Sequence, residues 1–251
     1  DKPKFYFTDE ERKIPMSIAE NIAAIRARMD AAAIAAGRDP QEIKLCAATK
    51  MNGGDAVREA IRGGVDLCGE NRVQELTAKL KEDAYRGAPV HFIGVLQTNK
   101  VKQVVGKVDV IQSVDRLNLL EAIQKEAAKQ GIIQDIFLEI NIGNEQSKSG
   151  FSTSEVLPLL EHIGEYPNIF VRGLMAIPPI SKKIGDNRKF FQEMLQLSVD
   201  IRAKKYDNVA VECLSMGMSD DFEDAIACGS TMIRVGTAIF GARDYTKLHQ
   251  K

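Results

Sequence analysis

The sequence has few residues of the kinds that build disulfide frameworks or zinc sites. Its four cysteines are scattered without any C-x-x-C pair, and its three histidines lie far apart. Disulfide-rich and zinc-binding chains instead show paired cysteines or closely spaced cysteine and histidine ligands. We therefore predict no metal site, and we expect the isolated cysteines to be small core residues.

An excess of charge of either sign is also missing. The 34 lysines and arginines are balanced by 35 aspartates and glutamates, so the formal net charge is -1. Proteins that bind nucleic acid or an anionic membrane surface usually carry a basic patch. The balance predicts neither nucleic acid nor a membrane as a partner, but it allows a small anionic ligand.

Long apolar runs are absent too. No segment approaches the roughly 18 apolar residues that a membrane span needs, and the charged start of the sequence lacks the apolar core of a signal peptide. We therefore expect a cytoplasmic protein. Hydrophobic residues make up 44% and charged residues 27% of the chain, a composition that argues against disorder.

The chain does contain a regular alternation of apolar runs and helical stretches. Ser17 and Glu20 form a predicted capping box at the start of a long amphipathic helix, which Gly37 ends. Each later pair of apolar run and helical stretch occupies about 25 to 30 residues, as βαβ units do. We predict strands at 43–49, 66–69, 90–94, 109–113, 135–141, 169–176, 210–214 and 232–235. We predict helices between them at 55–62, 73–81, 100–105, 116–129, 154–163, 188–203 and 220–227.

Eight strands alternating with helices in 251 residues predict an α/β fold, a single closed (β/α)8 TIM barrel with an extra N-terminal helix. An open doubly wound sheet is the alternative. No linker, low-complexity segment or domain boundary interrupts the pattern. We therefore expect residues 1–251 to form one domain.

The first predicted strand leads into a lysine, Lys50, which is followed by turn-forming residues. Because side chains alternate along a strand, Lys50 would share a face with two small residues, Ala48 and Cys46, which leave room above the amine. Such a lysine is either a nucleophile or a side chain whose stem packs while its ammonium reaches water. This stretch alone does not decide between the two.

In α/β barrels the ligand lies at the C-terminal ends of the strands, so the residues that follow each strand are candidates for the site. Asn71, after the second strand, is either a helix cap or a ligand contact. His91 stands at the start of the third strand, at the wrong end for catalysis, and is predicted to be structural. Lys148 lies in the loop after the fifth strand.

The last two strands show the pattern of a phosphate site. Such sites in barrels often combine the loops after strands seven and eight with the N-terminus of a short extra helix, where N–H groups and the helix dipole favour an anion. Ser215 and Ser219 flank a glycine after strand seven, and Gly236 and Thr237 follow strand eight. Arg234 adds a cation, which is either part of the site or half of a barrel-core salt bridge.

Together these segments resemble the pyridoxal 5'-phosphate (PLP) homeostasis proteins, the YggS/PROSC-like family, which is related to the N-terminal barrel of alanine racemase. The matching segments run in order from the first strand to the last, so the resemblance covers about the whole barrel. One departure is Val90, where the family often has an aromatic residue. The segments are Ala48-Thr-Lys50, Gly69-Glu-Asn-Arg-Val-Gln-Glu75, His91-Phe-Ile-Gly-Val-Leu-Gln-Thr-Asn-Lys100, Lys148-Ser-Gly150, Gly173-Leu-Met175, Leu214-Ser-Met-Gly-Met-Ser219 and Arg234-Val-Gly-Thr-Ala-Ile-Phe-Gly-Ala-Arg243.

The resemblance implies a function in intracellular PLP (vitamin B6) homeostasis, with little or no catalysis by the protein itself. It implies that Lys50 holds PLP as a Schiff base. It also implies that Ser215, Gly236 and Thr237, with help from Ser219, hold the phosphate. PLP-dependent apo-enzymes are the expected recipients of the cofactor.

The resemblance also places three residues around the ring of PLP. Asn71 would neighbour the ring, Lys148 would occupy the place of an alanine racemase arginine near the ring hydroxyl, and Arg234 would face the pyridine nitrogen. An arginine there cannot accept the proton of the ring nitrogen, so the ring is a poorer electron sink than one paired with an aspartate. Such a site can hold PLP while doing little carbanion chemistry.

Two other functions are open at this point. A PLP-dependent amino-acid racemase needs a second proton-transfer group, which alanine racemases bring as a tyrosine from a C-terminal domain of the partner subunit. Here the sequence ends shortly after the last strand, and Tyr245 lies in that tail, so we expect a PLP carrier and a monomer instead. An aldolase-like barrel would use Lys50 without PLP, and the purified protein would then be colourless.

Overall fold

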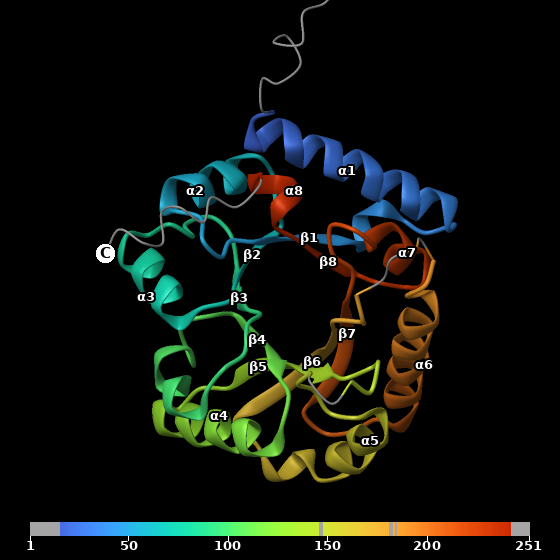
Figure 1. The fold of residues 1–251 in the computed structure, drawn as a ribbon. Helices are drawn as coiled ribbons and strands as arrows, with labels where there is room; N and C mark the ends of the chain where they lie inside the picture. Colours follow the sequence, from blue (N-terminus) through green and yellow to red (C-terminus); the bar gives the residue numbers. More distant parts are fainter. Residues whose placement is uncertain (1–15, 146–147, 181–182, 184, 242–251) are drawn as a thin grey trace, which may run out of the picture.

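The computed structural model describes residues 16–241 apart from 146, 147, 181, 182 and 184. Its strands form a closed parallel barrel in which each strand pairs with its neighbours in sequence, and β1 pairs with β8. Helices surround this barrel (Figure 1). The predicted (β/α)8 barrel is confirmed, and the open sheet is wrong because the pairing of β1 with β8 closes the sheet. The strands are β1 (Lys44–Ala48), β2 (Leu67–Glu70), β3 (Val90–Phe92), β4 (Val110–Val114), β5 (Gln134–Ile140), β6 (Ile169–Ala176), β7 (Val209–Ser215) and β8 (Met232–Val235).

The extra N-terminal helix, α1 (Ile18–Ala35), begins at the predicted capping box. The Ser17 N–H donates to Glu20 Oε2 at 2.7 Å, and the Glu20 N–H donates to Ser17 Oγ at 3.2 Å. Figure 1 shows α1 on the outside of the barrel beside β1 and β8, where it contacts α7 and α8. The other helices are α2 (Gly54–Arg62), α3 (Val73–Lys81), α4 (Leu117–Gln130), α5 (Thr153–Glu161), α6 (Arg188–Lys204), α7 (Phe222–Ala227) and α8 (Thr237–Phe240).

One predicted helix has a different form. Where we expected an α-helix at 100–105, the structure has the 3₁₀ helix η3 (Thr98–Gln103), in which the Lys100 N–H donates to Gln97 O at 2.9 Å. Tight i→i+3 turns of this kind are common in short connecting segments. The other predicted strands and helices are confirmed, with boundaries that differ by no more than two residues.

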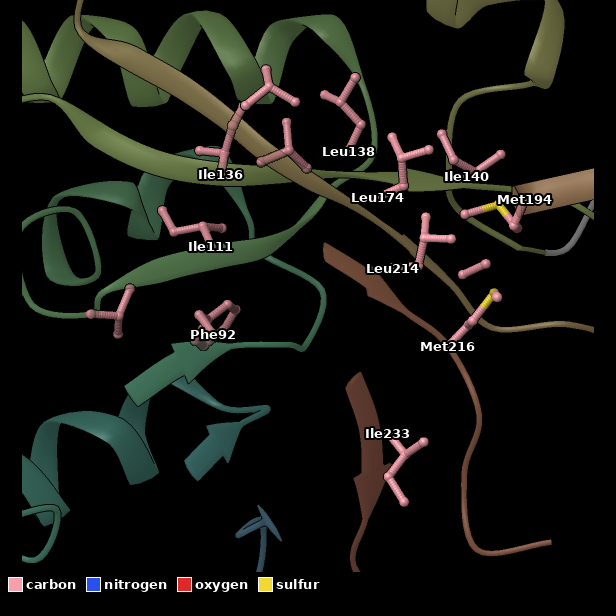
Figure 2. Close-up of a cluster of buried hydrophobic side chains, with 14 of the residues drawn as sticks. Phe92, Ile111, Ile136, Leu138, Ile140, Leu174, Met194, Leu214, Met216 and Ile233 are labelled. Carbon is pink, nitrogen blue, oxygen red and sulfur yellow. The ribbon is translucent and has the colours of Figure 1, made fainter. Parts of the chain in front are cut away.

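The strands are buried on both faces, as expected for a parallel sheet covered by helices. Figure 2 shows the cluster that the outward faces form with helix residues such as Met194 of α6. This outer cluster includes Phe92, Ile111, Leu138, Leu174, Leu214 and Ile233. A separate cluster from the inward faces comprises Cys46, Leu67, Val110, Phe137, Met175 and Met232.

The cysteines are free thiols, and three of the four, Cys46, Cys68 and Cys228, are buried. Burial raises the pKa of Cys68 to about 12 and that of Cys213 to about 11. These thiols therefore stay protonated and unreactive near neutral pH, as expected of core residues. No helix in the part of the chain that the structure describes combines the length and apolar character needed to cross a membrane.

Candidate cofactor-binding site

A cavity of about 710 Å³ opens at the C-terminal ends of the strands. It collects residues from the loops after several strands, as the barrel fold predicts. Six of the predicted site residues line it, namely Lys50, Asn71, Ser219, Arg234, Gly236 and Thr237. Sequence reasoning missed the charged lining residues Arg72, Glu75 and Asp220. The rule that barrel sites lie just after the strands would have found Arg72 and Asp220.

Lys50 lies two residues beyond the end of β1, in a turn. Cys46 belongs to the inward-facing cluster and Ala48 lines the cavity beside Lys50, so the predicted alternation of faces is confirmed for these two residues. The backbone of the turn is unusual, because Met51 has a φ of 64°. Few residues other than glycine adopt this left-handed conformation. The turn after β1 is therefore a specific local structure rather than a simple strand end.

The predicted phosphate end of the cavity is formed by the loops after β7 and β8. Helix α8 begins at Thr237 with Gly236 as its N-cap, and Ser219 lines the same cavity from the β7 loop. The first N–H groups of a helix have no acceptor within it. A Cβ atom at position 236 would lie 3.3 Å from Ala48 O. Glycine therefore allows the start of α8 to approach β1 next to Lys50.

Asn71 has an unpaired acceptor. Its Oδ1 atom is buried and has no hydrogen-bond partner. Arg72, not Asn71, is the N-cap of α3, and no side chain caps that helix, so the capping interpretation of Asn71 is wrong. The loop after β3 packs tightly here, since a Cβ atom on Gly94 would lie 2.0 Å from Asn71 O. A buried acceptor without a partner at a cavity wall is the environment expected of a ligand contact.

Arg234 of β8 is 5% exposed and is held by three oxygen atoms. Its Nη1 donates to Ser215 O and Ser215 Oγ, both at 2.7 Å, and its Nη2 donates to Ala176 O at 3.0 Å. These acceptors are two carbonyls and a hydroxyl rather than the carboxylate of a core salt bridge. Arg234 is thus a fixed cation at the cavity wall.

The Ser215 side chain does not line the cavity. It is fully buried, and its Oγ donates to Gln112 Oε1 at 2.6 Å while it accepts from Arg234. Gln112 Nε2 lies 2.8 Å from His91 Nδ1. Burial lowers the pKa of His91 to about 4, so its ring is neutral near pH 7. His91 is therefore buried and does not line the cavity, a position that fits the structural role predicted for it, and Gln112 and Ser215 connect it to Arg234.

Lys148 also lies away from the cavity lining. Its Nζ donates to Pro178 O at 3.0 Å and lies 2.5 Å from Glu145 Oε2. It therefore ties the loop after β5 to the loop after β6. The contact with the ring hydroxyl that the resemblance implies for Lys148 stays a prediction.

Glu139 of β5 is a buried carboxyl that sequence reasoning missed, although an acidic residue within an apolar strand was a visible signal. It is 7% exposed, and Ser149 Oγ donates to it at 3.4 Å. Burial, with a further contribution from Asp115, raises the pKa of Glu139 to about 7, and Arg234 opposes the rise. Close to neutral pH this group therefore changes its charge.

We expect Glu139→Gln to be more stable than the wild type at pH 8, with the advantage disappearing toward pH 5. The pKa of Glu139 is raised from 4.5 to about 7 in the folded state, so its favourable contribution is complete below pH 4.5 and is lost as the pH rises through 7. A pKa shift of this size changes the free energy of unfolding by on the order of 3 kcal/mol. Urea unfolding at both pH values measures the difference. The exposed Glu155→Gln control should gain nothing at pH 8, and a pH-independent effect at Glu139 would contradict the assignment.

Comparisons with known proteins agree with this geometry. The family model described as "Alanine racemase, N-terminal domain" matches residues 17–244. The chain is 42% identical to the pyridoxal phosphate homeostasis protein of Aquifex aeolicus over 230 residues. This match covers 92% of this chain and 100% of that protein. The Escherichia coli protein of the same name is 41% identical over 92% of this chain and 98% of its own length.

A solved structure is similar over the same region. PipY of Synechococcus elongatus with PLP bound matches with a TM-score of 0.77 and 30% identity, covering 90% of this chain and 100% of that chain. Its structure without PLP matches with a TM-score of 0.79. The similarity therefore extends over most of the chain.

Proposed function

The chain belongs to the alanine racemase N-terminal domain family and, within it, to the pyridoxal phosphate homeostasis proteins, and from this membership we propose that it binds PLP in the cavity at the strand ends and acts in PLP homeostasis. The observation that carries the proposal is the shared cavity. Lys50 after β1, Arg234 in β8 and the start of α8 all line it.

The residues present suit each part of PLP. The amine of Lys50 matches the aldehyde, and the fixed guanidinium of Arg234 matches the ring nitrogen, which can accept a hydrogen bond. The unpaired Asn71 Oδ1 offers an acceptor at the cavity wall. The hydroxyls of Ser219 and Thr237 and the N–H groups at the start of α8 match the phosphate dianion.

When bound, PLP supplies an aldehyde that condenses with a primary amine and a ring that can draw electrons from the attached carbon. We propose that Lys50 provides that amine. Arg234 donates hydrogen bonds and has no acceptor, so it cannot take a proton from the ring nitrogen. Ser215, which is itself bound by Gln112, accepts hydrogen bonds from Arg234, so we propose that Ser215 acts through Arg234 rather than by touching the phosphate. This arrangement favours binding of PLP over catalysis with it.

We expect little or no racemisation of alanine or other common amino acids. Among the described residues that line the cavity there is no tyrosine, histidine or cysteine to protonate a second face. Tyr245 lies outside the described residues. A coupled assay with each enantiomer measures turnover. Conversion in both directions at rates within the usual enzyme range of about 1 to 1,000 per second would contradict the carrier role.

We extend the proposal to the partners of the protein, which would deliver PLP to PLP-dependent apo-enzymes as a cytoplasmic monomer. Five exposed apolar side chains lie on loops or helix starts that follow strands at the end of the barrel where the cavity opens, a position suited to a protein partner. They are Val95, Leu117, Ile177, Ile180 and Met218. Activation of an apo-enzyme in the presence of a scavenger for free PLP tests direct delivery, and light scattering tests the monomer.

A further inference from the structure

The peptide groups on both sides of Lys50 are held by side chains from outside β1. Before it, Thr49 O accepts a hydrogen bond from Lys79 Nζ at 2.8 Å. After it, the Met51 N–H donates to Glu75 Oε2 at 2.7 Å. Lys79 and Glu75 both belong to α3, so side chains of one helix bind the backbone immediately before and after Lys50.

Lys79 is an unusual lysine because it is 5% exposed. Its ammonium group has three donors, and three oxygens lie within reach: Thr49 O, Glu70 Oε2 at 2.6 Å and Glu75 Oε2 at 3.4 Å. Glu70 is fully buried, and its Oε2 also accepts from Thr49 Oγ1 at 3.0 Å and Tyr85 Oη at 3.2 Å. The charges of Lys79 and Glu70 are therefore paired with each other and fully hydrogen-bonded beside the turn.

The second oxygen of Glu70 extends this network to the next loop. Glu70 Oε1 accepts from the Asn71 N–H at 2.7 Å and from the Arg72 N–H at 3.2 Å. Asn71 is the residue whose buried Oδ1 lacks a partner at the cavity wall. One carboxylate thus fixes the backbone of Asn71 and, through Thr49 and Lys79, the backbone that leads into Lys50.

Stability alone is a weak explanation for such a network. Removing two charges from water is costly, and well-packed apolar residues often replace a buried ion pair without loss of stability. The turn, in contrast, needs specific support, because Met51 holds a φ of 64° that is uncommon outside glycine. The Met51 N–H is the group that Glu75 binds.

We propose that Lys79 and Glu75 are positioning residues for Lys50: they hold the left-handed turn so that the Lys50 side chain enters the cavity, and Glu70 keeps Lys79 in place. This inference rests on the proposed function, in which Lys50 is the amine that binds PLP. Lys79 acts only through the backbone, because it does not line the cavity.

The first test uses the protein without cofactor. Amide hydrogen exchange of Met51, followed by NMR, should be at least about tenfold faster in Glu75→Ala than in the wild type, because a hydrogen bond to a charged acceptor is lost. Glu75→Gln keeps an acceptor and should restore protection. Glu155→Ala is the matched control, since Glu155 also accepts a backbone N–H at 2.7 Å but on α5, away from the cavity. Unchanged exchange in Glu75→Ala would overturn the proposal.

The second test measures binding of PLP. Glu75→Ala should slow the appearance of the Schiff-base absorption band roughly tenfold or more, while Glu75→Gln and Glu155→Ala stay near the wild-type rate. If Glu75→Gln is as slow as Glu75→Ala, the charge of Glu75 acts on the ligand and the positioning role is wrong. Failure of the wild type itself to bind PLP would instead overturn the proposed function.

Lys79 is tested by the double variant Glu70→Gln, Lys79→Met, which removes both buried charges together. We expect it to fold, as judged by circular dichroism, and to form the band roughly tenfold more slowly than the wild type. A folded double variant that reacts at the wild-type rate would exclude Lys79 from the role. If the double variant does not fold, the comparison of Glu75→Ala with Glu75→Gln decides the proposal.

Discussion

Lys50→Ala should eliminate the PLP adduct that borohydride traps, while the barrel remains folded. The side chain lies in a turn beyond β1 and is only partly buried, so its truncation costs little packing, whereas a covalent bond to PLP has no substitute. The measurement is mass spectrometry after reduction, with circular dichroism as the test of folding. We expect complete loss of the adduct and a thermal midpoint near that of the wild type.

Lys148→Ala is the matched control for Lys50→Ala. Lys148 also lies on a loop after a strand, but its ammonium group is engaged with Pro178 O and Glu145. We expect this variant to keep the adduct. An adduct that persists in Lys50→Ala and disappears in Lys148→Ala would move the Schiff base to Lys148.

Pyridoxal, which lacks the phosphate, should bind at least two orders of magnitude more weakly than PLP. Hydrogen bonds to a charged group contribute roughly 1.5 to 3 kcal/mol each, and two such bonds lost correspond to a factor of about 100 or more. The expected donors are Ser219, Thr237 and the N–H groups at the start of α8. Titration of both ligands by absorbance gives the ratio, and equal affinities in the wild type would show that these loops do not hold the phosphate.

The structure also indicates which variants can assign the contribution of the phosphate to individual residues. A bulky residue at Gly236 would press on Ala48 O and so disturb the strand beside Lys50 as well as the phosphate end. Thr237→Val and Ser219→Ala remove a hydroxyl without adding bulk. Each should weaken PLP by about tenfold or more and leave pyridoxal nearly unchanged.

The fold could be predicted from the sequence because each strand is a short apolar run and each boundary carries its own local signal. Ser17 and Glu20 formed the expected capping box. The prediction of an α-helix at 100–105 was wrong. The conformation of so short a segment depends on the elements that it connects, and the structure has the 3₁₀ helix η3 there. Six of the seven predicted site residues line one cavity, since strand ends in a closed barrel converge on one face.

The remaining details of the site depend on contacts between distant residues. The Ser215 hydroxyl turns into the barrel because Gln112 of β4 and Arg234 of β8 bind it there, and nothing local to Ser215 shows this. In the same way, Glu70 and Lys79 look like surface charges in the sequence. Only the packing of α3 on β2 brings them together beneath Lys50.

Covalent binding of PLP to Lys50 can be measured on the wild-type protein itself. The wild-type protein is incubated with PLP, its absorption spectrum is recorded before and after borohydride reduction, and the reduced protein is digested for peptide mapping. We expect a Schiff-base band that reduction removes and a single modified peptide that carries the pyridoxyl group on Lys50. A protein without such a band, or one modified at another lysine instead, would contradict it.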